Sequence, residues 1–314
     1  MLKNSHKKQA FSLLELSVVI LIIGILITGI MKGGSLVSAS RLNAARSLTA
    51  RSPVGEINSL AAWYETTSLQ SFSKRTAGGS GAPPTHSASI SATQLKESDP
   101  IELWRDIGPK CINNYAIFNS SGSTQADYNG TCNALSQATT NSRPSYSLSG
   151  INNLPSVSFA SGQTLLLNVL KDGVLNVSTK IVVFSVDSKP SSGNSATILN
   201  NNPTANTQRI FIDPTYISVN NGGTESANIA ITYSIKNTYI VAVIFNGSNS
   251  YYKINNGAIT LASAIGINSS NDLIVGGENF VGKISEIIIF NRMLKETEIT
   301  EIFNYLGKKY KVTV

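Results

Sequence analysis

The sequence has few of the residue types that most enzymes use for chemistry. Its 314 residues include two cysteines and two histidines, and charged residues make up 14% of the chain. The histidines are His6, within the first ten residues, and His86, in a stretch rich in serine, glycine and proline. We therefore expect no Ser-His-Asp or Cys-His catalytic arrangement. Two cysteines without a nearby histidine do not make a zinc site either.

Signals for phosphate and nucleic-acid binding are missing as well. Gly276-Gly277 falls in a predicted turn between strands, so no Gly-rich loop follows a strand as in a phosphate-binding site. The formal charge is +7, but three lysines lie in the first ten residues. The remaining positive excess is spread out, without a basic run interleaved with aromatic residues. These features predict no nucleic-acid partner.

One long hydrophobic run stands near the start of the chain, over residues 11–31, with Glu15 as its single charged residue. Because roughly 20 helical residues cover the ~30 Å hydrocarbon core of a bilayer, this run predicts a transmembrane helix. The basic residues before it fit the positive-inside rule. We therefore expect residues 1–10 in the cytoplasm and the chain after Lys32 outside it.

The basic leader MLKNSHKKQA ends in the small residue Ala10, Phe11 follows, and Glu15 stands four residues further on. This order of residues resembles the amino terminus of type IV prepilins and pseudopilins. The family nearly always has glycine where this chain has Ala10. The resemblance implies that a prepilin peptidase cuts between Ala10 and Phe11 and methylates the new amino group. It also implies that Glu15 acts in filament assembly through the N-terminal helix, beside other pilin or pseudopilin subunits.

A signal sequence is the alternative for the same stretch. An ordinary secretory signal fits poorly, because its apolar region is about 7–15 residues long and is followed by a small-residue cleavage site. Here Lys32-Gly33-Gly34 follows the run instead. An uncleaved signal anchor, which would keep residues 1–10, remains the second reading.

The next part of the sequence predicts a longer helix and then a linker. Apolar and small residues recur at helical spacing as far as Tyr64, with Pro53 expected to kink or interrupt the helix. This pattern predicts a pilin-like helix over residues 11–65. Residues 66–99 are rich in Ser, Thr, Gly and Pro and poor in apolar residues, which predicts a tether, with a long surface loop as the alternative.

The rest of the chain has the pattern of an all-β protein. Short segments rich in β-branched and aromatic residues are separated by turn signals such as Asn255-Asn256-Gly257. The clearest segments are 180–186, 209–213, 216–219, 228–233, 239–245, 250–254 and 283–290. They predict an antiparallel jelly-roll sandwich. A short C-terminal helix follows, with an apolar stripe from Ile299 to Tyr310 and basic residues, including Lys309, suited to the helix dipole near its end.

Three stretches near the start of this region are distinctive: Trp104–Gly108, Asn141–Tyr146 and Asn152–Phe159. The stretch Val281–Arg292 closes it, followed by Glu298-Ile299 and Tyr305-Leu306. Together they resemble laminin-G-like, concanavalin A-like domains. The resemblance implies one such sandwich over residues 100–314. This fold hosts lectins, glycosidases, adhesion modules and inert spacers. No strand carries the Glu-x-Asp-x-x-Glu pattern of concanavalin-type glycosidases. We therefore expect a head that is not an enzyme and that binds a glycan or protein ligand.

The cysteines and three aspartates are the remaining candidate sites. Cys111 and Cys132 lie outside the predicted cytoplasmic part, which favours a disulfide worth about 2–4 kcal/mol over two separate buried thiols. The laminin-G resemblance allows a structural Ca²⁺, and Asp187, Asp213 and Asp272 stand at predicted strand ends where ligands would lie. The alternative for each aspartate is a turn-forming role. No other cofactor is expected.

These inferences combine into one hypothesis with one alternative. The chain is expected to be a minor pilin or pseudopilin, inserted once in the bacterial inner membrane and then moved into a pilus or periplasmic pseudopilus. Its laminin-G-like head would serve adhesion or recognition. The alternative is an uncleaved, membrane-anchored, lectin-like surface module.

Overall fold

The computed structural model describes residues 13–73, 95–112, 133–201, 207–222, 227–262, 266, 268–269 and 271–314. The chain forms two compact units, which meet between Ala44 and Ala45. We call residues 45–314 the head. The predicted cleavage site at Ala10 and Phe11 lies outside the described residues.

The long helix α1 runs over Leu13–Ala50. Its residues up to Ala44 form the described part of the first unit, and its last residues, from Ala45 on, belong to the head. The helix ends where the sequence predicted an interruption. Ser52 has extended backbone angles and Pro53 begins a 3-10 turn, Pro53–Gly55. Proline cannot donate the next helical hydrogen bond and disfavours helical angles in the residue before it.

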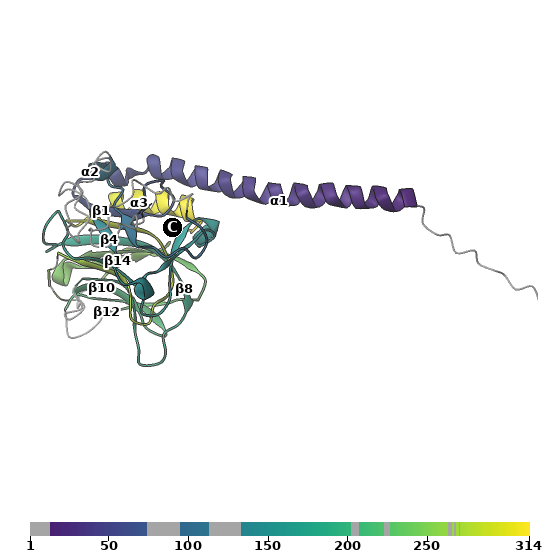
Figure 1. The fold of residues 1–314 in the computed structure, drawn as a ribbon. Helices are drawn as coiled ribbons and strands as arrows, with labels where there is room; N and C mark the ends of the chain where they lie inside the picture. The colour runs from purple at the N-terminus through teal and green to yellow at the C-terminus, as the bar shows by residue number, and fades with distance from the viewer. Residues whose placement is uncertain are drawn as a thin grey trace, which may run out of the picture. The chain divides into compact units, whose positions relative to one another are not determined.

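The head is built from two antiparallel sheets (Figure 1). Sheet A has eight described strands, and β1 pairs with β17 beside the main path. Along that path the order is β15 (Thr260–Leu261), β14 (Tyr251–Ile254), β13 (Thr238–Phe245), β8 (Ser178–Ser188), β17 (Val281–Phe290), β6 (Ser156–Phe159) and β5 (Ser145–Ser147), with β1 at Leu60–Glu65. Each predicted segment in this sheet is a strand.

Sheet B has nine described strands. Its order is β12 (Ala227–Thr232), β11 (Tyr216–Asn220), β10 (Thr207–Ile212), β9 (Ala196–Asn201), β16 (Leu273–Gly276), β7 (Thr164–Leu167), β4 (Ala134–Ser136), β3 (Leu103–Arg105) and β2 (Phe72–Ser73). The one-turn helix α2, Pro109–Ile112, follows β3, and three further 3-10 turns lie at Thr140–Ser142, Ile151–Asn153 and Gly247–Asn249. The predicted sandwich is confirmed.

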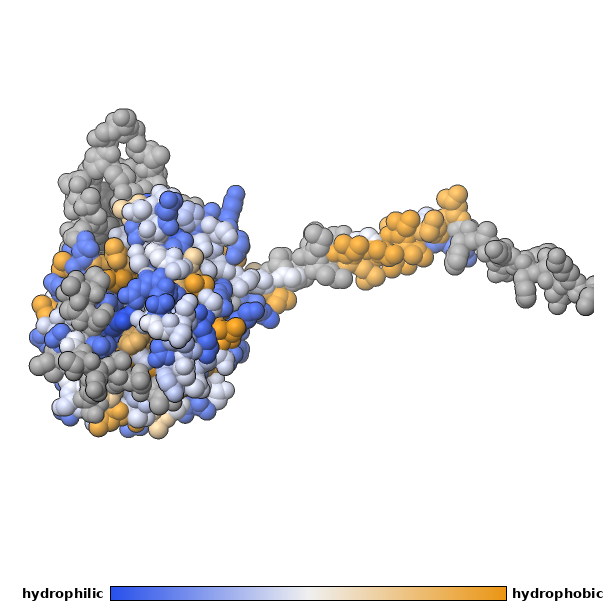
Figure 2. Space-filling view, turned by 90° about the horizontal axis from the view of Figure 1, so that it is seen from below, coloured by the Kyte–Doolittle hydropathy of each residue, from blue (hydrophilic) through white to orange (hydrophobic). Residues whose placement is uncertain are grey.

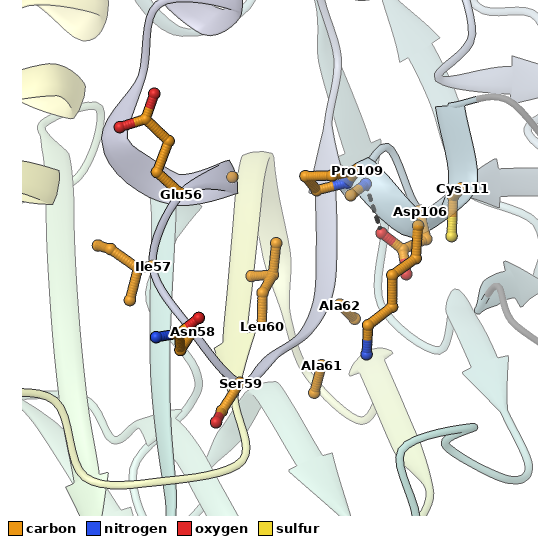
Figure 3. Close-up of a pocket in the computed structure, with 13 residues that line it drawn as sticks. Glu56, Ile57, Asn58, Ser59, Leu60, Ala61, Ala62, Asp106, Pro109 and Cys111 are labelled. Carbon is orange, nitrogen blue, oxygen red and sulfur yellow. Dashed lines mark hydrogen bonds between the residues drawn. The ribbon is translucent and has the colours of Figure 1, made fainter.

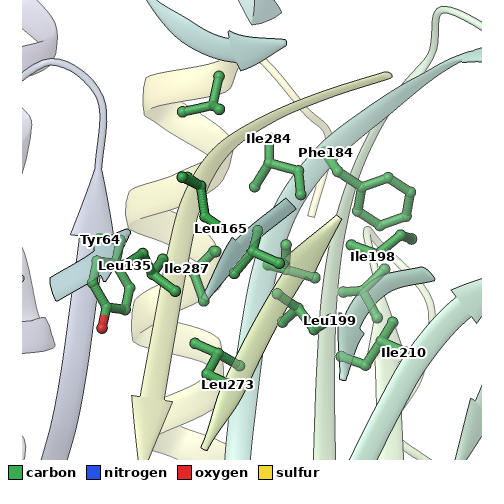
Figure 4. Packing of buried hydrophobic residues seen from close by; sticks show 14 of the residues in the cluster. Tyr64, Leu135, Leu165, Phe184, Ile198, Leu199, Ile210, Leu273, Ile284 and Ile287 are labelled. Atoms are coloured by element: carbon green, nitrogen blue, oxygen red, sulfur yellow. The ribbon is translucent and has the colours of Figure 1, made fainter. Parts of the chain in front are cut away.

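The main hydrophobic core lies between the two sheets. Alternate residues of each strand point inward, so Ile284 and Phe184 of sheet A face Ile198 and Ile210 of sheet B (Figure 4). All four side chains are fully buried. This layer is the ordinary packing of a β-sandwich.

A second core covers the outer face of sheet A. Helix α3, Glu296–Tyr310, packs its apolar stripe there, with Ile302 and Leu306 fully buried against Ile288 (Figure 1). The predicted C-terminal helix and its apolar stripe are confirmed. Ala45, in the last turns of α1, belongs to the same cluster.

Two predicted boundaries are wrong. The helix does not reach residue 65, because Leu60–Glu65 forms β1 and pairs with β17 in the register Trp63↔Ile288. The apolar residues at helical spacing before Tyr64 also fit one buried strand, LAAWYE, rich in aromatic residues.

The predicted linker over residues 66–99 is also part of the head at both ends. Thr66, Thr67 and Ser71 are fully buried, and Phe72 pairs with Trp104 across β2 and β3. Leu95 lies in the main core. Residues 74–94 lie outside the described part. The sandwich therefore begins well before residue 100, and buried polar residues connect its first two strands.

Among the described residues, no helix is both long enough and apolar enough to cross a membrane. The transmembrane span predicted over residues 11–31 is thus not confirmed by the structure and stays a prediction.

Candidate functional site

Helix α1 exposes apolar side chains on every side. From Val18 to Ile23 and from Ile25 to Ile27 each side chain is exposed, and Leu13 is 87% exposed. Successive helical residues point about 100° apart, so such a run has no polar face. Figure 2 shows these side chains as an orange stretch along the helix. Monomeric soluble proteins rarely expose so large an apolar surface, which marks a site of contact with lipid or protein.

Glu15 lies in the first turn of α1 and is exposed. A carboxylate at this end of a helix interacts favourably with the helix dipole. Its neighbours Leu14 and Leu16 are 73% and 57% exposed. If this surface is covered by lipid or other helices, the carboxylate has to be neutralised or paired. The role predicted for Glu15 in filament assembly is not tested by these contacts.

The head contains a buried ionic cluster that the sequence did not predict. Lys309 of α3 donates to Glu65 at the end of β1 and to Glu286 of β17, each at 2.9 Å. All three side chains are fully buried. Lys309 also donates to Thr49, in the last turn of α1, at 2.8 Å. One ammonium group thus joins four elements of the head.

The carboxylates of Glu65 and Glu286 accept further hydrogen bonds from neutral groups. The indole of Trp63 and the hydroxyls of Tyr305 and Tyr310 donate to Glu286 at 2.8, 2.8 and 2.9 Å. The backbone N–H and the hydroxyl of Thr67 donate to Glu65 at 2.8 and 2.7 Å. A buried ion pair is favourable only when such additional bonds satisfy its remaining lone pairs.

Electrostatics keep this cluster charged. Burial alone would raise the pKa of Glu65, but Lys309 and Thr67 outweigh it and hold that pKa below its usual range. Burial alone would lower the pKa of Lys309, but Glu286 and Glu65 raise it well above its usual range. Lys309 lies in the last turn of α3, as predicted, and on its buried face together with Tyr305 and Leu306.

The pKa of a second buried lysine, Lys180 of β8, is shifted in the opposite direction. Its ammonium donates to the amide oxygen of Asn201 and to the carbonyl of Gln208, at 3.2 Å for the latter. Burial lowers the pKa of Lys180 to about 7, although Asp272 acts in the other direction. Unlike Lys309, this lysine is therefore close to half neutral at pH 7.

The lowered pKa of Lys180 predicts that the stability of the head depends on pH. Between pH 7 and 9 the unfolded chain keeps the Lys180 proton and the native head loses it, so the free energy of unfolding rises with pH, by about 2 kcal/mol from this group. Lys180→Met should remove that rise, while Lys189→Met, at an exposed position, should keep it. Chemical denaturation at several pH values measures the slope. Equal slopes in wild type and Lys180→Met would contradict the assignment.

Two of the three predicted calcium ligands, Asp187 and Asp213, have partners within the protein. Asp187 accepts from Lys283 at 2.5 Å. Asp213 accepts the backbone N–H groups of Thr215 and Tyr216 at 2.6 and 2.7 Å, which is the turn-forming arrangement. Within the described ranges, no three His, Cys, Asp or Glu side chains gather as a metal site would need. Calcium binding stays a prediction without a ligand cluster to support it.

Cys111, in α2, is buried and disulfide-bonded. Cys132, the only other cysteine of the chain, lies outside the described residues. The Cys111–Cys132 pairing stays a prediction.

Comparison with solved structures gives only distant likenesses. A Trypanosoma rangeli sialidase has a TM-score of 0.46 at 10% identity, over 80% of this chain and 33% of the sialidase. The same sialidase in complex with sialic acid has a TM-score of 0.47 at 13% identity, over 68% of this chain and 32% of its own. A structure of botulinum neurotoxin type C, whose cell entry depends on interaction with two ganglioside molecules, has a TM-score of 0.38 at 16% identity, over 47% of this chain and 41% of its own.

The chain thus spans about a third of the length of the sialidases it resembles. With TM-scores below 0.5, we draw no functional conclusion from these structures. Among curated proteins, none matches the chain. Residues 5–31 match the family model described as the prokaryotic N-terminal methylation motif. The match includes Ala10, Phe11 and Glu15, and it confirms the predicted prepilin-type amino terminus.

Proposed function

We propose that this protein is a type IV pilin-like filament subunit, a minor pilin or a pseudopilin. A prepilin peptidase would remove residues 1–10 and methylate Phe11, and helix α1 would then pass from the inner membrane into a filament of pilin-type subunits. The head would be carried outside the cytoplasm on a pilus or periplasmic pseudopilus.

The observation that carries this proposal is the methylation motif over residues 5–31, continued by the apolar surface of α1. Burying apolar surface contributes roughly 25 cal/mol per Å². The exposed side chains between Leu13 and Ile27 therefore favour lipid or neighbouring helices over water. A prepilin-type helix meets both environments in turn, which accounts for an apolar surface without a polar face.

For the head we propose recognition of a glycan or protein rather than catalysis. Its fold class is one that hosts binding modules. The buried carboxylates Glu65 and Glu286 are both engaged by Lys309 and do not face each other across an open cleft. This part of the proposal concerns the sandwich as a whole and names no ligand.

The alternative is an uncleaved, membrane-anchored surface module that binds a glycan or protein. The specific observation in its favour is Ala10, which stands where prepilins nearly always have glycine. In this case the leader would stay on the chain and no filament would contain it.

Deleting the host's prepilin peptidase distinguishes the filament subunit from the uncleaved surface module. In wild-type cells we expect the full chain in filaments sheared from the surface or in the periplasmic pseudopilus fraction. In peptidase-deficient cells we expect it only in the membrane, with its leader intact. Recovery of equal amounts in the filament fraction of both strains would contradict the proposal, and a membrane-only location in both would favour the alternative.

A further inference from the structure

A cavity of about 190 Å³ opens in the head between residues 55–62 and residues 106–111 (Figure 3). Ile57, Leu60 and Pro109 contribute apolar walls, and Asp106 is its buried acidic group, only 3% exposed. Lys110 and the exposed carboxylate of Glu56 also line the cavity. The site is therefore a small, mainly apolar space with one buried carboxylate.

The hydrogen bonds of Asp106 come from neutral donors. Its Oδ1 accepts the backbone N–H groups of Trp63 at 3.0 Å and Gly108 at 2.8 Å. Its Oδ2 has a longer contact, 3.4 Å, with the side-chain amide of Asn133, and the backbone N–H of Asn133 also acts to lower the pKa of this carboxyl. The Asn133 amide also donates to the carbonyl of Ala61. Asp106 and Asn133 thus satisfy backbone groups at the outer edge of β1.

Among the acids buried in the described part of the head, Asp106 differs from the others in having no ion pair. Glu65 and Glu286 both pair with Lys309, and Glu102 lies 3.6 Å from Arg143. Within the described residues no ion pair includes Asp106, and the neighbouring Lys110 pairs with Asp172 at 2.8 Å. Burial accordingly raises the pKa of Asp106 to about 6 despite its hydrogen bonds. A buried carboxylate without a cation is costly, and at a cavity it is typical of a ligand site.

We propose that this cavity binds a primary alkylammonium group, with the ammonium at Asp106 Oδ2 and its carbon chain along Ile57, Leu60 and Pro109. The long contact to Asn133 leaves Oδ2 the weaker-bonded oxygen, and the apolar walls suit an aliphatic stem. The ammonium could be carried by a small free amine or by a lysine side chain of a partner. This site is independent of the amino-terminal helix and goes beyond the function proposed above.

Titration of the full-length chain in detergent tests this proposal, with n-butylammonium as the probe and n-butanol as its neutral match. At pH 7.5 we expect saturable binding of the amine and at least about tenfold weaker binding of the alcohol, which is the effect of roughly 1.4 kcal/mol. Binding should weaken by a similar factor at pH 4.5, where Asp106 is protonated. Nα-acetyl-lysine amide distinguishes the sources, because tighter binding of this probe than of butylammonium indicates a partner's lysine.

Three variants make the test specific. Asp106→Asn should abolish the preference for the amine over the alcohol. Ile57→Trp narrows the cavity while keeping the carboxylate, and should weaken amine binding even if Asp106→Asn fails to fold. Lys110→Met removes the nearby cation and should bind the amine at least as tightly as wild type. Absence of saturable binding, equal binding of amine and alcohol, or unchanged binding by Ile57→Trp would overturn the proposal.

Discussion

We expect the Lys309→Met substitution to lower the free energy of unfolding of the head by about 3–5 kcal/mol, the usual effect of removing one partner from a buried ion pair. The substitution leaves Glu65 and Glu286 buried without the ammonium that both contact at 2.9 Å. Methionine keeps the helix propensity and much of the side-chain volume, so the loss is electrostatic. Chemical denaturation followed by the fluorescence of Trp63, whose indole donates to Glu286, measures it.

Lys308→Met is the matched control, because Lys308 is adjacent in sequence and exposed. Its effect should stay within about 0.5 kcal/mol. Adding Glu65→Gln and Glu286→Gln to Lys309→Met should restore part of the loss, since the buried groups are then neutral. Equal stabilities of Lys309→Met and Lys308→Met would show that the cluster contributes little.

The cluster also predicts the pH range of this contribution. The pKa of Glu65 is below its usual value, so the stability it adds is present above about pH 4.5 and is lost as the pH falls further. The pKa of Lys309 is raised, so its part is present below its ordinary value and is lost only in strong alkali. The two shifts together favour a head that keeps this contribution between about pH 5 and 10.

The second large effect concerns Glu15. We expect Glu15→Ala to leave membrane insertion intact and to reduce incorporation into filaments by at least about tenfold, the result of losing roughly 1.4 kcal/mol or more. In a filament interior without water, a carboxylate among apolar helices requires a cation. The methylated amino group of Phe11, on the same chain or on a neighbour, is the cation that the prepilin-type sequence supplies.

Membrane and sheared filament fractions, compared by quantitative immunoblotting, measure this effect. Ser17→Ala is the control, because Ser17 lies in the same region of α1 and its hydroxyl donates to the nearby carbonyl of Leu14. It should assemble as wild type does. Equal incorporation of Glu15→Ala and Ser17→Ala would remove Glu15 from the assembly mechanism.

The sandwich was predictable because its strands are simple. Segments such as Tyr239–Phe245 consist almost entirely of β-branched and aromatic residues, and glycine-rich or asparagine-rich turns separate them. The apolar stripe of α3 is equally direct, because residues 299, 302, 303, 306 and 310 fall on one face. In both cases local periodicity and tertiary burial agree.

The start of the head could not be predicted, because its local composition and its tertiary burial disagree. Residues 66–71 are polar and have the composition of a linker, yet Thr66, Thr67 and Ser71 are fully buried. Their burial depends on the carboxylate of Glu65, which accepts from Thr67 and is itself balanced by Lys309, 244 residues away. A polar cluster assembled from four distant segments has no periodicity that a single sequence can display.

The roles of Asp106 and Lys180 could not be predicted from the sequence either, because they depend on tertiary contacts. Asp106 lies in the Trp104–Gly108 stretch that carries the laminin-G resemblance, but only the cavity and the lack of an ion pair among the described residues make it a candidate site. Lys180 lies within a confirmed strand, where a lysine is expected to face water. Its burial follows from the polar groups of Asn201 and Gln208 on the opposite sheet.

The most direct test of the proposed function is the mass of the amino-terminal peptide of the protein recovered from its native cell envelope. The prepilin-type motif predicts a peptide that begins at Phe11 and carries one added methyl group on its amino nitrogen. A peptide that still contains residues 1–10 would contradict processing as a pilin and would leave a membrane-anchored surface head.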